Sequence, residues 1–184
     1  MEKNDRLNIS ANTRTLVYCA LLTALGVVLG GMLSIPAMPL GSYTLKIGFG
    51  VLPVILAAVL FGTAYGGIVG GLTDLLQALI FPKGAYMPWF TVIGILFGLI
   101  PGLFFRKGQR PTFPRLLGAI ACGQTVGSVI CNTALMVLLY GLPLEAILPL
   151  RAINQAVMIP LYAVLIWLLL PVLRRAGIRG NREE

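Results

Sequence analysis

The chain contains no histidine and few charged residues. Catalysis by Ser-His-Asp or Cys-His groups is therefore excluded, as is every metal site that needs an imidazole. Only six residues are acidic, and four of these lie in the two tails. The three cysteines form no Cys-x-x-Cys pair, which indicates small packing residues rather than a redox or metal site. The sequence predicts no metal site, no cofactor and no enzyme activity.

Charge is also too scarce to cover a water-facing surface. Charged residues make up 11% of the 184 residues and hydrophobic residues 58%, whereas soluble domains have about 25% and about 45–50%. This balance excludes both a soluble globular protein and a disordered one. Because one helix needs about 20 apolar residues to cross a bilayer, the length allows about six crossings. We expect an all-α integral membrane protein.

Apolar segments separated by short connections predict a single domain, residues 1–184, formed by a bundle of six transmembrane helices. The segment 34–46 is rich in Pro, Gly and Ser and is predicted to be a loop. Residues 141–151 are predicted to form a loop or an interfacial segment. The predicted spans cover approximately residues 13–33, 47–62, 66–81, 89–105, 116–140 and 152–173.

Lysine and arginine are divided unevenly between the two sides of this bundle. If the N-terminus is cytoplasmic, 11 of the 14 basic residues fall on the cytoplasmic side, and Lys46, Lys83 and Arg151 fall outside. This distribution follows the positive-inside rule and predicts that both termini are cytoplasmic. The net charge of +8 is then a topology signal. Nucleic-acid binding, the rival interpretation, would need a basic stripe, which the sequence lacks.

Polar residues inside the spans are candidates for ligand contacts, because ionisable groups are costly in a membrane and usually face a cavity or a partner. Asp74 is the only acidic residue within a span, and Gln77 lies one turn further along. The fifth span carries Gln124, Ser128 and Asn132 at intervals of four. Asp74 and Asn132 have similar depth below the outer surface and are predicted ligand contacts. Gln124 and Ser128 are interpreted as helix–helix hydrogen bonds.

The outer side combines cations with aromatic rings. Lys46, Lys83 and Arg151 either snorkel to lipid headgroups or bind an anionic solute, with Arg as a bidentate carboxylate partner. We favour the second role for Lys46 and Arg151. Trp89 and Phe90, at the start of the fourth span, either belong to an interfacial belt or stack on a flat ring. Together these residues predict an anionic, aromatic small molecule as ligand.

Four segments and an Ala20-x-x-x-Ala24 pattern resemble the substrate-binding membrane subunit (S component) of energy-coupling factor (ECF) vitamin transporters, folate-specific branch. The resemblance covers nearly the whole chain and rests on the order and spacing of the segments. At position 89 the folate-specific branch often has Gly, whereas this chain has Trp. The Trp predicts a bulky ring beside the site. The segments are KIGFGVLP (46–53), GGIVGGLTDLLQALIFPKGAYMPWFT (66–91), NTALMVLLYG (132–141) and LPLRAINQAVMIP (148–160).

The resemblance implies high-affinity binding of folate at the outer face of a prokaryotic plasma membrane and delivery to an ATP-driven complex. It implies docking through Ala20 and Ala24 on a transmembrane scaffold subunit that two cytoplasmic ATPases drive, with loop 34–46 as a lid. Asp74 or Asn132 would then meet the pterin, and Lys46 and Arg151 the glutamate carboxylates. The candidate site residues are Lys46, Asp74, Phe90, Thr91, Asn132 and Arg151.

Three other functions remain open at the level of sequence. The same fold could carry another cargo, such as a queuosine precursor or pantothenate. The chain could instead be a stand-alone ion-coupled carrier, or a structural membrane protein without cargo. It has no Walker A motif, so ATP hydrolysis by that route would require another subunit.

Overall fold

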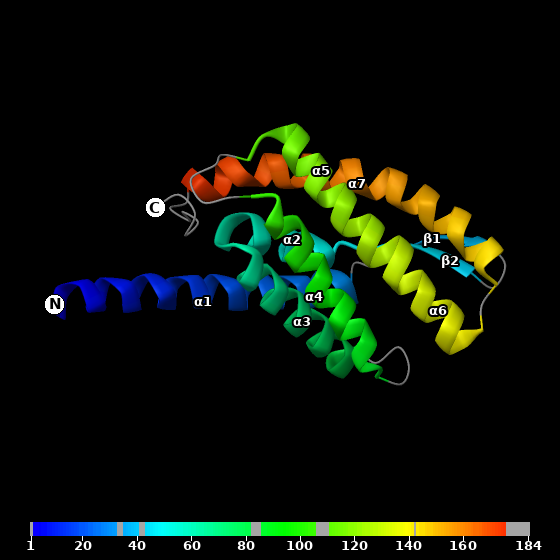
Figure 1. Cartoon of the computed structure of the whole chain (residues 1–184), viewed down its shortest axis with the longest axis horizontal. Coiled ribbons are helices and arrows are strands. Elements are labelled where there is room, and N and C mark those ends of the chain that lie inside the picture. Colours follow the sequence, from blue (N-terminus) through cyan, green and yellow to red (C-terminus); the bar gives the residue numbers. More distant parts are fainter. Residues whose placement is uncertain are drawn as a thin grey trace.

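The computed structural model describes residues 2–32, 35–40, 43–81, 86–105, 111–141 and 143–175. These residues form a bundle of six helical rods and one short hairpin (Figure 1), which confirms the predicted six-helix architecture. The elements are α1 (Glu2–Gly31), β1 (Ile35–Leu40), β2 (Tyr43–Ile47), α2 (Val51–Phe61), α3 (Thr63–Ile80), α4 (Pro88–Leu103), a continuous fifth rod made of α5 (Phe113–Gln124), the π-helix η1 (Thr125–Asn132) and α6 (Thr133–Tyr140), and α7 (Leu144–Arg175).

The bundle has two distinct ends. The beginning of α1 and the end of α7 lie at one end, and the β1–β2 hairpin lies at the other (Figure 1). We call these the terminal end and the hairpin end. The even number of rods explains this arrangement, because six rods return the chain to the end of the bundle where it started. The side of the membrane on which the termini lie stays a prediction.

The rods differ in how much of a bilayer they can cross. Among the described residues, three helical segments are long and apolar enough to span a bilayer: Thr13–Gly31, Phe113–Leu139 and Ile147–Leu173. The apolar helix α2 has only 11 residues, which extend about 16 Å, roughly half of the hydrocarbon core. All of its residues from Leu52 to Phe61 are buried. The short helix therefore forms the core of the bundle, surrounded by longer helices that carry exposed apolar side chains.

A hairpin stands where the sequence predicted an irregular loop. β1 and β2 pair antiparallel, from Ile35 opposite Ile47 to Leu40 opposite Tyr43. The prolines of β1 are tolerated because each strand of a two-stranded hairpin has an unpaired outer edge. Since Ile47 belongs to the hairpin, the second helix begins at Val51 and not at residue 47 as predicted.

The first and last helices are longer than predicted. α1 begins at Glu2 and α7 at Leu144, so most of 141–151, predicted to be a loop or an interfacial segment, is helical. Proline removes a backbone donor and normally interrupts a helix, but α7 continues through three prolines. All three are exposed and recur every 11 residues, which places them on one side of the helix. They are Pro149, Pro160 and Pro171.

Glycines bring α3 and α4 into backbone contact. A Cβ atom on Gly66 would lie 2.8 Å from the carbonyl oxygen of Gly98, and one on Gly94 would lie 2.9 Å from that of Gly70. Both distances are shorter than a Cβ contact allows, so only glycine permits this approach. These contacts join the first half of α3 to the middle and later turns of α4. The packing extends to Asp74 on α3, because a Cβ on Gly94 would lie 3.0 Å from Asp74 Cβ.

Candidate substrate-binding cavity

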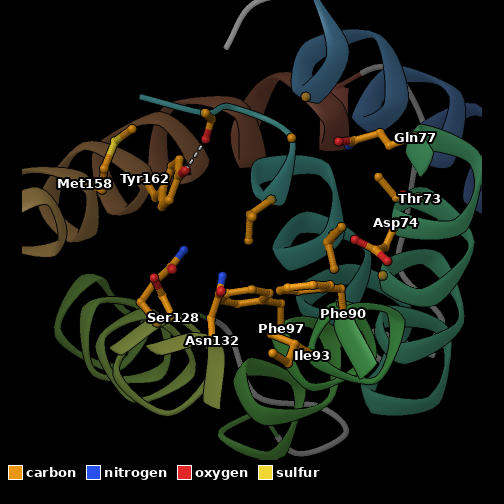
Figure 2. Close-up of a pocket in the computed structure, with 18 of the residues that line it drawn as sticks. Thr73, Asp74, Gln77, Phe90, Ile93, Phe97, Ser128, Asn132, Met158 and Tyr162 are labelled. Carbon is orange, nitrogen blue, oxygen red and sulfur yellow. Dashed lines mark hydrogen bonds between the residues drawn. The ribbon is translucent and has the colours of Figure 1, made fainter. Parts of the chain in front are cut away.

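A cavity of about 320 Å³ opens between the helices. It lies in the half of the bundle nearest the hairpin, because its α3 residues come from the last turns of that helix and its α4 residues from the first turns. Figure 2 shows side chains pointing into it from several rods. Asp74 is the charged residue of its described lining. The polar lining residues are Thr73, Asp74, Gln77, Gln124, Ser128, Asn132, Asn154, Gln155 and Tyr162.

The α3–α4 wall holds the carboxylate in place. Thr91 Oγ1 donates a hydrogen bond to Asp74 Oδ2 at 2.9 Å. The Tyr86 hydroxyl lies 2.8 Å from the same Thr91 oxygen. Thr91 does not line the cavity itself but fixes the carboxylate that does. A half-buried acid held in this way presents hydrogen-bond acceptors to the cavity, which suits a ligand with N–H donors.

Gln77 ties this wall to α1. Its Nε2 donates to the carbonyl oxygen of Gly26 at 3.1 Å, and a Cβ on Gly30 would lie only 2.7 Å from Gln77 Cδ. The glutamine therefore occupies the space that a side chain at residue 30 would need. Gln77 therefore has two roles: it connects α3 to α1 and it lines the cavity.

The opposite wall is built on the π-helix. Ser128 and Asn132 lie on η1 and line the cavity together with Gln124, which precedes it. Arg151 reaches across from α7. Its Nη1 donates to the carbonyl oxygen of Ser128 at 2.9 Å, and its Nη2 lies 3.4 Å from Asn132 Oδ1. π-helical turns are rare and frequently occur at functional sites. Here they bring polar side chains spaced four apart to one face.

Two aromatic rings form a third wall. Phe90 and Phe97 both line the cavity from α4, and Figure 2 shows the two rings next to each other. Seven residues span roughly 10 Å along an α-helix. Flat aromatic faces of this kind stack on planar ligands. The neighbouring Trp89 is 61% exposed and does not line the cavity, so the expected bulky ring beside the site is not found there.

Two buried polar atoms at this cavity lack partners among the described residues. Neither Thr73 Oγ1, on α3, nor Gln155 Oε1, on α7, forms a hydrogen bond with a described residue. Leaving a buried polar group unpaired costs about 1–3 kcal/mol. Tyr162, by contrast, donates its hydroxyl hydrogen to the carbonyl oxygen of Gly48, just before α2 (Figure 2). Both atoms are available to bind a polar group that enters the cavity.

The family model for "ECF-type riboflavin transporter, S component" matches residues 10–175. The chain belongs to the ECF transporter S components. These are transporter subunits and not enzymes, so the chain is a multi-pass membrane protein that works with an ECF transporter complex.

Individual S components differ in the cargo for which they are named. This S component is 32% identical over 152 residues to the folate transporter FolT of Clostridium novyi, covering 83% of this chain and 85% of the relative. It is 24% identical over 129 residues to FolT of Leuconostoc mesenteroides, covering 70% and 66%.

Solved structures agree with the fold of this S component. The crystal structure of FolT bound with folic acid matches at a TM-score of 0.68 and 26% identity, covering 81% of this chain and 87% of that one. The S component for biotin from an ECF-type ABC transporter matches at a TM-score of 0.67 and 19% identity, covering 95% and 96%. The second match concerns the fold alone.

The structure of this S component brings most of the predicted site residues together. Asp74, Phe90 and Asn132 line the cavity, whereas Thr91 and Arg151 stand behind Asp74 and Asn132 and bond to them. The backbone of Lys46 lies in β2, but its side chain lies outside the described part. Lys83 also lies outside the described residues.

Sequence reasoning missed several lining residues. Gln124 and Ser128, interpreted as helix–helix contacts, line the cavity, as do Phe97, Thr73 and Gln155. Phe97 could have been predicted from its position two turns after Phe90, because residues seven apart lie on the same side of a helix. Gln155 shares a helix face with Arg151 at the interval i, i+4. Thr73 offered no signal, since a lone Thr in an apolar helix is common.

The face of α1 turned away from the cavity is apolar and exposed. Ala20 and Ala24 are both exposed, and the flanking Leu16, Val17 and Leu21 are 52–61% exposed. Small residues four apart allow the close approach of another helix. Gly26 and Gly30, which face Thr73 and Gln77 of α3, mark the opposite, packed side. One side of α1 thus contacts the cavity while the other is unpaired among the described residues.

Proposed function

We propose that this S component binds folate in the cavity and delivers it for uptake. The observation that carries the proposal is the arrangement of Asp74, held by Thr91, across from Asn132 with an aromatic wall between them. The folate transporter FolT of Clostridium novyi, at 32% identity, and the similar fold of FolT bound with folic acid both support folate as the cargo.

The cavity matches the chemistry of a pterin ring. A pterin is flat and carries an amino group and a ring N–H beside a carbonyl oxygen. Asp74 would accept from these donors, Phe90 and Phe97 would stack on the ring, and Asn132 would meet an oxygen or ring nitrogen. The two unpaired buried oxygens, Thr73 Oγ1 and Gln155 Oε1, would gain hydrogen-bond partners from the bound ligand.

The remainder of folate would extend toward the hairpin. The cavity volume of about 320 Å³ lies at the lower end of the range for small-molecule pockets, about 300–1,000 Å³. A cavity of this size would hold the pterin and leave the glutamate part to extend toward the end of the bundle where β2 carries Lys46. Lys46 is our candidate for its carboxylates, and the hairpin is our candidate for a cover over the site. Arg151, the other cation predicted for the carboxylates, bonds two oxygens of η1 instead.

The exposed face of α1 would dock on the transmembrane scaffold subunit of the ECF complex, with Ala20 and Ala24 at the contact. Two cytoplasmic ATPases would drive that scaffold. The membrane would be a prokaryotic plasma membrane, with both termini on the cytoplasmic side. A bulky Ala24→Trp variant should bind folate normally but fail to support uptake in the assembled complex; normal uptake would remove this face from the docking contact.

A ligand panel tests the cargo. Detergent-purified protein is heated with folate, riboflavin, biotin, pantothenate or a queuosine precursor, and its Tm is followed. A ligand at 100 times its Kd adds about 2.7 kcal/mol to the stability of the folded state. We expect the largest Tm increase with folate. A larger increase with riboflavin would keep the family and replace the cargo, and no increase with any vitamin would contradict a binding function.

A further inference from the structure

Arg151 is placed behind the cavity rather than in it. It bonds two oxygens of η1, the carbonyl of Ser128 at 2.9 Å and the amide oxygen of Asn132 at 3.4 Å. Asn132 lines the cavity, and Arg151 does not. The planar guanidinium presents its donors in a rigid fork, so one side chain can hold both oxygens in a fixed relation.

The bond to Asn132 decides which end of its amide faces the cavity. An asparagine amide has an oxygen that only accepts and an NH2 group that only donates. Arg151 has donors and no acceptor, so it pairs with the oxygen and excludes the flipped amide. The NH2 group then points to the cavity, as Figure 2 shows for the labelled Asn132.

The bond to Ser128 fixes the backbone that carries this amide. The Ser128 carbonyl also lies 3.4 Å from Thr133 Oγ1, so it has a local partner and a remote one. The shorter bond comes from Arg151 on α7. Arg151 therefore anchors both the backbone turn before Asn132 and the side chain itself.

We propose that Arg151 is a positioning residue that makes Asn132 a hydrogen-bond donor to the cargo. The cavity then has an acceptor wall at Asp74 and a donor wall at Asn132. It selects a planar ligand that offers N–H groups on one side and an oxygen or ring nitrogen on the other. The folate identity of that ligand rests on the function proposed above, but the role of Arg151 in orienting Asn132 does not.

A double-mutant cycle separates this role from direct contact with the glutamate carboxylates. The variants are Arg151→Met, Asn132→Ala and the combination, each titrated with folate and with pteroate, which lacks the glutamate. We expect Arg151→Met to weaken both ligands by a similar factor, tenfold or more, and to add nothing once Asn132 is Ala. Weakening of folate alone, or losses that multiply in the double variant, would overturn the proposal.

A matched variant tests the donor directly. Asn132→Asp keeps the shape and the acceptor for Arg151 but removes the NH2 group. Binding should fall at least tenfold while Tm is maintained. The control is Arg14→Met, because Arg14 is exposed on α1 near the terminal end. Folate binding by this variant should be unchanged. Normal binding by Asn132→Asp would contradict a donor role.

The ligand-free protein supplies a readout that does not depend on cargo. If Arg151 holds Asn132, the losses of Tm in Arg151→Met and Asn132→Ala should be less than additive in the double variant. Additive losses would overturn the proposal even if folate binds. If the wild-type protein binds neither folate nor pteroate while the two losses remain coupled, the folate assignment fails and the Arg151–Asn132 connection stands.

Discussion

The two polar walls of the cavity fix a hydrogen-bonding side chain in different ways. On the α3–α4 wall, glycines bring two α-helices into backbone contact and Thr91, one layer behind, bonds Asp74. On the opposite wall, the backbone is a π-helix and the anchor is Arg151 from α7. Close packing makes the first wall rigid by itself. The second wall, with wider turns, depends on a long charged side chain from another helix.

The largest effect is expected from breaking the close packing. In Gly98→Ala, the new Cβ would lie 2.7 Å from the backbone nitrogen of Gly67 and closer still to the Gly66 carbonyl. Backbone atoms cannot rotate away, so the variant should lose about 3 kcal/mol of stability or more, and its Tm should fall by at least several degrees. The control is Gly118→Ala on α5, whose Cβ would meet nothing within 4 Å. Equal Tm values for the two variants would show that the first wall is not held by packing.

The next effect concerns the acceptor on the rigid wall. Asp74→Asn keeps the size and an oxygen for Thr91 but replaces a charged acceptor. Hydrogen bonds to charged groups contribute about 1.5–3 kcal/mol, so folate affinity should fall about 10-fold to 150-fold, measured by calorimetric titration. Glu145→Gln, an exposed acid on α7 outside the cavity, should bind normally. Equal affinities in both variants would remove Asp74 from the site.

A smaller effect is expected when the anchor of Asp74 is removed and Asp74 itself remains. Thr91→Val deletes the hydroxyl that donates at 2.9 Å. A typical hydrogen bond is worth about 1 kcal/mol, so affinity should fall about fivefold. The same substitution in the Asp74→Asn background should cost less, since the two residues act together. An undiminished loss there would mean that Thr91 contacts the ligand by itself.

The convergence of Asp74 and Asn132 on one cavity was predictable because helix geometry is regular. Asp74 and Asn132 were assigned similar depths from their positions in the spans, and both line one cavity. The limits of the second helix were not predictable in the same way. The apolar run from residue 47 suits a strand or a helix equally well, and pairing of Ile47 with Ile35 decided the outcome.

The role of Arg151 also lay beyond the sequence. Its charge near a span end suggested an anion partner, and that suggestion is still a prediction. Its contacts with Ser128 and Asn132 depend on α7 beginning at Leu144, in spite of Pro149, and on the unusual turns of η1. Both features result from packing between distant segments, which local patterns do not reveal.

The smallest effect should come from the local hydroxyl on the second wall. Thr133→Val is the same change as Thr91→Val, at a residue that is 2% exposed and whose Oγ1 lies 3.4 Å from the Ser128 carbonyl. The carbonyl keeps its shorter bond from Arg151, so no acceptor is left unpaired. Folate affinity should change by less than about twofold in the same titration. A loss as large as that of Thr91→Val would show that both walls depend on a neighbouring threonine, and the contrast between local and remote anchoring would disappear.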